Sequence, residues 1–233
     1  MQFIESNVFG VRAALYSLVR PGGAPRFLLF PMIHIGSAEY YLQIHKRLDE
    51  CDVILFEGVR TLRARVLSLS YRIVARRRRL GLVAQDASLL RGLHGQLIHA
   101  DVAPGEFKDN WSQIPAHMRL AILLIAPLYG GYHYLTATKE SLGKKMKSED
   151  LASADEVMRG DFAPGLDKAI MTSRDAKLIG AIDSIVNLPT TPTTVGIVYG
   201  AGHMKAVTAA LMEKHHYRVN GSEWLTVFDY SGD

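Results

Sequence analysis

Three short apolar runs, each ending in an ionisable residue that adjoins a glycine or is one residue away from it, most constrain the fold of this chain. They read FLLFPMIHIGS, DVILFEGVR and TVGIVYGAGHM. A short continuous apolar run is typical of a strand covered on both faces in a largely parallel sheet. Each run passes into a stretch with a helical pattern, so each ionisable residue is expected where a strand gives way to a helix. These residues are His34, Glu57 and His203.

In an open α/β sheet, such junctions lie at the carboxyl edge of the sheet, where ligands bind. Two imidazoles and a carboxylate at one edge therefore predict a functional site. Each residue alone also has a plainer interpretation. Glu57 can form a structural ion pair with a neighbour such as Arg60. His34 can be a core histidine with a satisfied ring, and His203 can be a helix cap or a packing residue.

Strands that alternate with helices predict an α/β fold with a central, largely parallel mixed sheet flanked by helices. The chain has 233 residues, of which 48% are hydrophobic, enough to bury the core of one domain. A single domain over 1–233 is therefore expected, with a helical, cap-like insertion around 104–160. Other expected elements are a hairpin of 11–20 and 26–35, a helix over 37–50 with Ser37 as its N-cap, a strand at 81–86, one or two helices within 162–187 and a closing hairpin at 217–230.

Arginines concentrate the formal net charge of +4 in one stretch, 60–81. Apolar residues alternate with them at spacings near three and four, which predicts an amphipathic helix that ends at Gly81. The plainest interpretation is a solvated basic face. A nucleic-acid surface is not expected, because Tyr71 is the lone aromatic residue among the arginines. Peripheral contact with an acidic lipid surface is the stronger of the two alternatives.

The sequence favours a cytoplasmic protein. Its single cysteine, Cys51, excludes an internal disulfide and is typical of a reducing compartment. The first 20 residues lack the basic leader and unbroken apolar core of a signal peptide. The longest apolar stretch, 120–135, is broken by Pro127 and is shorter than the roughly 20 residues that a spanning helix needs, so it is expected to be a buried or interfacial helix.

The order of these motifs resembles the TraB/PrgY/GumN family, which is grouped with the Tiki proteins, the erythromycin esterases and the ChaN-like haem-binding proteins. That family is marked by two Gly-x-x-His motifs, a glutamate on an intervening strand and an arginine in a Glu-Arg-Asp or Glu-Arg-Asn segment. The resemblance covers roughly residues 25–215. Two positions depart from the pattern, because Pro31 replaces the first glycine and Ser173 precedes the arginine. The residues that fill the family's places are His34, Glu57, Arg174 and His203.

The resemblance implies a Tiki-like fold and a metal-dependent hydrolase of peptide or ester bonds. His34, Glu57 and His203 would hold a divalent ion such as manganese, cobalt or zinc, which would activate water. Arg174 would bind a substrate carboxylate or stabilise an oxyanion, and it would pair with Glu57 or face the ligand. The erythromycin esterase relatives suggest a second arrangement, in which a histidine activates water directly.

A non-catalytic protein of the same fold is the alternative. It would bind a peptide or a small molecule and act as a regulator, as the relatives linked to pheromone shutdown suggest. No nucleotide cofactor is expected, because the chain lacks a phosphate-binding loop. Asp86 and Asp101 also end apolar runs, so they could extend the site, although aspartate at such a position commonly caps the next helix.

Overall fold

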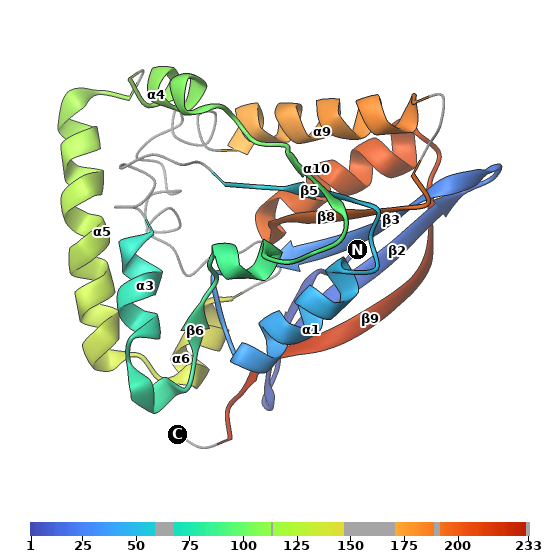
Figure 1. Ribbon diagram of the computed structural model, residues 1–233. Helices are drawn as coiled ribbons and strands as arrows, with labels where there is room; N and C mark the ends of the chain where they lie inside the picture. The colour runs from blue at the N-terminus through green and yellow to red at the C-terminus, as the bar shows by residue number, and fades with distance from the viewer. Residues whose placement is uncertain (59–67, 113, 147–170, 189–191, 232–233) are drawn as a thin grey trace.

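A mixed, largely parallel sheet forms the centre of the computed structural model, which describes residues 1–58, 68–112, 114–146, 171–188 and 192–231. In these ranges the sheet has seven strands, in the order β1-β2-β3-β8-β5-β7, with β9 paired to β2 (Figure 1). The strands are β1 (Ile4–Ser6), β2 (Gly10–Arg20), β3 (Gly23–Met32), β5 (Val53–Phe56), β7 (Gln96–His99), β8 (Thr194–Gly200) and β9 (Arg218–Asp229).

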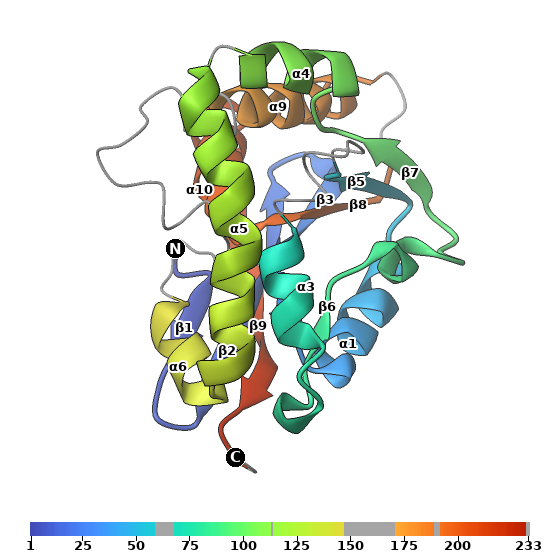
Figure 2. The same cartoon turned by 90° about the vertical axis from the view of Figure 1, so that its left-hand side faces the viewer.

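The parallel half of the sheet is β3-β8-β5-β7, and the three apolar runs form β3, β8 and β5. Every residue of β8 is buried, as expected of a strand covered on both faces. Two helices cover one face, α9 (Ser173–Val186) and α10 (Met204–Ala209), and α1 (Ala38–Leu48) covers the other (Figures 1 and 2). The Ser37 hydroxyl accepts a hydrogen bond from Tyr40 N at 3.1 Å, which confirms Ser37 as the N-cap of α1.

The antiparallel half confirms one expected hairpin and contradicts another. Strands β2 and β3 pair antiparallel around the turn, as predicted. The closing hairpin predicted at 217–230 is wrong, because β9 is one strand that pairs with β2 along its length. Its register shifts where Ser17 faces Gly221 and Leu18 faces Val219, so the residue between Val219 and Gly221 is an extra one. The Asn-Gly pair therefore makes an irregularity within a strand instead of a turn.

The arginine stretch also differs from its prediction. Its described part contains a short helix, α3 (Leu69–Ala75), and a separate turn of 3-10 helix, η1 (Arg78–Leu80). The α-helix therefore ends at Ala75, before the predicted end at Gly81. Gly81, with a φ of 61°, caps η1 instead. The Arg77 side chain donates a hydrogen bond of 2.7 Å to Ala137 O, which fixes this turn to the next part of the chain. The predicted residues 60–67 lie outside the described ranges.

The insertion predicted around 104–160 is helical as far as it is described. Beyond the carboxyl ends of the strands stand α3 and the long α5, side by side (Figures 1 and 2). Residues 147–160 of the predicted insertion, and 162–170 of the predicted helical region after it, lie outside the described ranges. The helices of the insertion are α4 (Pro104–Ser112), α5 (Ala116–Thr136) and α6 (Lys139–Lys145).

Small elements complete the fold. The strand predicted at 81–86 is reduced to the two residues of β6, which pair with β4 outside the main sheet. None of the helices described is both long enough and apolar enough to cross a membrane. The remaining elements are β4 (Ile35–Gly36), β6 (Val83–Ala84), η2 (Ala87–Leu90), η4 (Ala201–His203) and the π-helical η5 (Ala210–Lys214).

Candidate functional site

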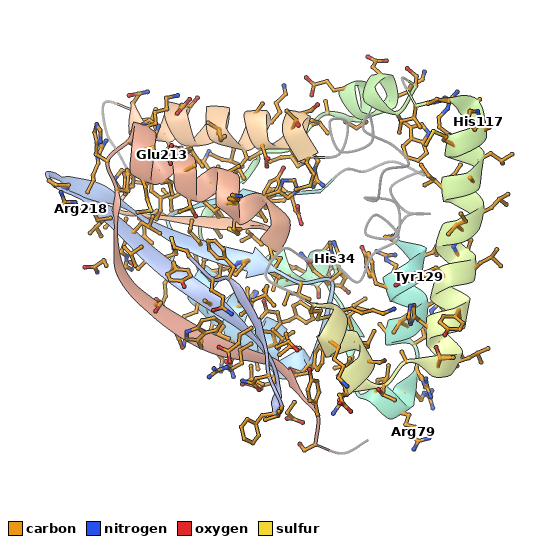
Figure 3. The ribbon with its side chains drawn as sticks, turned by 180° about the vertical axis from the view of Figure 1, so that it is seen from behind. His34, Arg79, His117, Tyr129, Glu213 and Arg218 are labelled. Atoms are coloured by element: carbon orange, nitrogen blue, oxygen red, sulfur yellow. The ribbon has the colours of Figure 1, made fainter. Side chains whose placement is uncertain are left out.

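Three neighbouring strands carry the predicted residues to one edge of the sheet. Strands β3, β8 and β5 are parallel and adjacent, and His34, His203 and Glu57 follow their carboxyl ends. The ends lie close in register, with Met32 opposite Gly200. Figure 3 labels His34 at this edge, on the side that faces α3. The three residues therefore lie at the carboxyl edge of the sheet, where the apolar runs predicted them.

An ion cluster of Arg174, Asp101 and Glu57 lies beside this edge. The guanidinium donates to Asp101 through Nε (2.8 Å to Oδ1) and Nη2 (2.9 Å to Oδ2), and Nη2 also donates to Glu57 Oε2 at 2.9 Å. The side chains of Arg174, Glu57 and Asp101 are 16%, 11% and 0% exposed. Arg174 thus pairs with Glu57, as expected of a guanidinium within the site. It also pairs with Asp101, through Nε and Nη2.

Burial and charge act in opposite directions on this cluster. Burial by itself would raise the pKa of Asp101, but the hydrogen bond and charge of Arg174 outweigh it and hold that pKa below its usual range. The backbone N–H groups of Gly58 and Val102 donate to the same carboxylate and act in the same direction. For Arg174, burial opposes the charge, yet the two carboxylates raise its pKa. Arg174 is therefore permanently charged.

His203 is held by a carboxylate of its own. Its ring is buried in η4, directly after β8, and Nδ1 lies 2.6 Å from Oδ1 of Asp175. Asp175 lies in the first turn of α9, next to Arg174, so one helix start supplies a partner to both Glu57 and His203. An ionised carboxylate accepts from the ring N–H at Nδ1, which leaves Nε2 as the basic nitrogen.

Tyr199 and Gly200, the last residues of β8, lie between the ion cluster and the pair of His203 and Asp175. The Arg174 guanidinium lies over the Tyr199 ring at 5.5 Å from its centroid, and the same ring makes an edge contact with His203 at 4.8 Å. A Cβ on Gly200 would lie 3.6 Å from both oxygens of Glu57 and 3.6 Å from Cδ2 of His203. Glu57 and His203 therefore flank one point above Gly200, which a side chain there would occupy.

His34 contacts an aromatic ring and not the ion cluster itself. It stacks on Tyr71 of α3, with centroids 4.6 Å apart and planes 8° from parallel. Burial raises the pKa of Tyr71, and the negative charge of Glu57 contributes to the rise. Tyr71 therefore contacts His34 and is influenced by the charge of Glu57. Within the described ranges, His34 itself makes no hydrogen bond, ion pair or ring contact with Glu57 or His203.

The described donors do not fit the metal site implied by the resemblance. Among the residues that the structure describes, no three histidine, cysteine or acidic side chains are grouped so that they could hold a metal ion. The contacts give the reason. Arg174 occupies a carboxylate oxygen of Glu57, Asp175 occupies Nδ1 of His203, and the ring of His34 stacks on Tyr71. The metal ion stays a prediction from the sequence.

Sequence reasoning found part of this site and missed the rest. Asp86 accepts from Ser88 N and is the N-cap of η2, whereas Asp101 belongs to the ion cluster. The missed residues are Asp175, Tyr199 and Tyr71. The one signal for Asp175 was its place directly after Arg174 at the start of a helix, and nothing in the local pattern set the two tyrosines apart from packing residues.

We expect Asp101 to make the fold sensitive to acid. A folded-state pKa below the unfolded value near 3.8 gives stability that is fully present above that value and is lost as pH falls through the folded pKa. The free energy of unfolding, measured with urea at a series of pH values, should therefore fall steeply below about pH 4. In Asp101→Asn this part of the fall should be missing, and the variant should be less stable at neutral pH.

Asp49→Asn is the matched control for this experiment. The pKa of Asp49 is also lowered, by a hydrogen bond from His94, but that pair is exposed, so its loss should hardly change the slope. An Asp101→Asn variant with the pH profile of the wild type would show that the buried pair does not control acid stability.

Comparison with known proteins adds no relative. No family model matches the chain, and neither a curated protein nor a solved structure matches it.

Proposed function

We propose that this chain hydrolyses an ester or a peptide bond, with His203 as the general base. The observation that carries the proposal is the partly buried 2.6 Å contact between His203 Nδ1 and Asp175, beside the Glu57–Arg174 ion pair. A histidine whose Nδ1 is held by a carboxylate is fixed in one tautomer and presents Nε2 to a reacting group. It is the arrangement suited to the direct activation of water.

The chemistry follows from these groups. Nε2 of His203 takes a proton from a water molecule, and the resulting hydroxide attacks the carbonyl carbon of the substrate. The imidazolium that forms is stabilised by Asp175. When the tetrahedral intermediate collapses, the bond to the leaving oxygen or nitrogen breaks, and the imidazolium returns its proton to that atom. The products are a carboxylic acid and an alcohol or amine.

Arg174 is the group suited to negative charge on the substrate. Among the described residues, its bonds to Asp101 and Glu57 use Nε and Nη2, which leaves Nη1 to donate to an oxyanion or a substrate carboxylate. The two carboxylates fix the plane of the guanidinium, and the ring of Tyr199 supports its face. A fixed donor costs no reorganisation when charge develops on the substrate.

No step of this mechanism runs through a metal ion. The metal-dependent form inferred from the family resemblance requires His34, Glu57 and His203 as joint ligands, and the described contacts of these residues support the metal-free form better. Membership of the TraB/PrgY/GumN family, with its Tiki-like fold, is part of the proposal. Its support is that Glu57, Arg174 and His203 converge at one sheet edge. The buried free thiol of Cys51 favours a cytoplasmic location.

Binding of a peptide or small molecule without turnover is the second candidate. The observation that favours it is the pairing of both Glu57 and Asp101 with Arg174, which is also the pattern of a structural ion cluster. The two candidates differ in one measurement, because a binder does not release product.

A methyl group added at Gly200 is expected to test whether hydrolysis takes place at this site. Gly200→Ala should fold normally, since its φ of -50° suits alanine and the contacts of 3.6 Å are ordinary. The methyl fills the point between Glu57 and His203, so kcat/KM should fall at least tenfold, about 1.4 kcal/mol in activation free energy. The assay is hydrolysis of a panel of p-nitrophenyl esters and chromogenic peptides, by wild type and variant, with a chelator present.

Gly180→Ala is the matched control, because Gly180 lies in α9 with nothing within 4 Å of an added Cβ. Its activity should equal that of the wild type. Three results would contradict the proposal. Hydrolysis that needs added manganese, cobalt or zinc would favour the metal-dependent form. No hydrolysis across the panel, with or without metal, would favour the binder. Unchanged activity in Gly200→Ala would place the reaction elsewhere.

A further inference from the structure

A continuous apolar face runs along the outer side of α5. Its four leucines are 60%, 57%, 73% and 75% exposed, in chain order, and its tyrosine is 62% exposed. At about 100° per residue, the five side chains fall within an arc of roughly 120°. We call this surface the leucine face, and it consists of Leu120, Leu124, Leu128, Tyr132 and Leu135.

The leucine face points away from the rest of the molecule. Opposite it, α5 buries Ile122 and His133, and it packs against α3. Figure 1 shows α5 as the outermost element on its side of the molecule, and Figure 2 looks onto that side. Large apolar side chains gathered on one exposed face mark an interaction surface, whereas single ones need no explanation.

A basic group adjoins one end of this face. Arg76, Arg78 and Arg79 are exposed in and before η1 and form no ion pair with a described acidic side chain. The hydrogen bond from Arg77 to Ala137 O holds the group next to the carboxyl end of α5. Figure 3 labels Arg79 at this end and His117 at the other. We call Arg76, Arg78 and Arg79 the arginine group.

We propose that the leucine face and the arginine group dock this protein on an anionic membrane surface. The leucines enter the boundary between headgroups and acyl chains, while the arginines contact anionic headgroups beside them. Tyr132 has the amphipathic side chain that suits the interface. The helix lies in the plane of the membrane, in keeping with the finding that no described helix can cross one.

Charge favours a membrane over a second copy of this chain. Residues 116–136 of α5 contain no aspartate or glutamate, so a second α5 packed on the leucines would offer the arginine group no acidic partner. An anionic bilayer presents apolar and acidic groups together and satisfies both parts of the surface.

Vesicle co-sedimentation of the full chain tests the proposal. The wild type should bind vesicles of phosphatidylcholine with phosphatidylserine added, bind phosphatidylcholine alone far less, and release at high salt. Leu124→Glu/Leu128→Glu should reduce binding more than tenfold. Arg78→Gln/Arg79→Gln should reduce binding to the anionic vesicles by about fivefold per arginine.

The control changes two apolar residues elsewhere that are even more exposed, Val8 (82%) and Phe9 (78%). Val8→Glu/Phe9→Glu should leave binding unchanged. Thermal unfolding followed by circular dichroism should show that all variants are folded. Wild type that ignores anionic vesicles, or a leucine variant that binds as the wild type does, would overturn the proposal. So would a wild-type oligomer that the leucine variant separates into monomers, because the occupant would then be a second copy.

Discussion

Replacing Arg174 with methionine should lower the free energy of unfolding at neutral pH by about 3–5 kcal/mol. Methionine fills a similar volume but leaves Asp101, whose side chain is 0% exposed, and Glu57, 11% exposed, without a counter-ion. A buried charge that loses its partner costs far more than the intact pair contributes. Urea unfolding at pH 7 measures the loss directly.

Acidification provides a second readout of the same variant. Without Arg174, only the backbone N–H groups of Gly58 and Val102 oppose the effect of burial on Asp101, so its pKa rises and the carboxylate is protonated at a higher pH than in the wild type. The difference in stability between the two proteins should therefore shrink as pH falls. Arg174→Lys should lie between them, since lysine restores the charge but not the planar fork.

Arg47→Met is the control for this variant. Arg47 also forms a two-pronged pair, with Glu223, but the side chains are 33% and 47% exposed. Its loss should cost about 1 kcal/mol or less. Equal effects of Arg174→Met and Arg47→Met would mean that the buried cluster contributes no more than a surface pair.

The second large effect should appear in turnover. His203→Ala should reduce kcat by about 10²–10⁴-fold, the usual contribution of a general base. Asp175→Asn should reduce kcat at least tenfold with little change in KM, because the amide no longer fixes the tautomer in which Nε2 is basic. A merely structural carboxylate would change the unfolding midpoint and leave the ratio of kcat to KM alone. Steady-state kinetics with a hydrolysed substrate from the panel measures both.

The chain contains a matched pair for this test. Asp183 accepts from His215 Nε2 at 2.7 Å, on the same helix as Asp175 but away from the sheet edge. Asp183→Asn should leave kcat unchanged. If Asp175→Asn also leaves kcat unchanged while His203→Ala abolishes activity, Asp175 is not the positioning residue. If both site variants keep full activity, His203 is not the base.

The local sequence pattern predicted the buried strands and the polar residues at their ends. An apolar run that ends in a charged residue fixes both a buried strand and the end at which its polar residue stands, so His34, Glu57 and His203 were assigned to the correct edge. The Asp175 contact depends on how α9 packs beside η4, 28 residues further along the chain, and no local periodicity carries that information. The sequence could not decide whether Asp101 is a helix cap or a site residue, because both roles need an aspartate at a strand end.

Two predictions from local pattern were wrong. Asn220-Gly221 is a strong turn signal, yet pairing with β2 over nearly its whole length outweighs the turn and absorbs the extra residue. The periodicity of the arginine stretch runs on past Ala75, where the backbone already leaves the α-helix and the Arg77 side chain donates to Ala137 O. At the Asn-Gly pair, pairing with a strand distant in sequence overrides the turn preference of neighbouring residues.

The pairing of β9 with β2 also bears on how the chain folds. It joins residues 10–19 to residues 218–229, so this pairing closes a loop of about 200 residues. Ladders that close such long loops form late and slow the search for the native state. Ser37 N, just before α1, donates to Val227 O of the same strand. The early hairpin and the start of α1 therefore acquire their last backbone partners from the far end of the fold, and local opening of β9 would release both together.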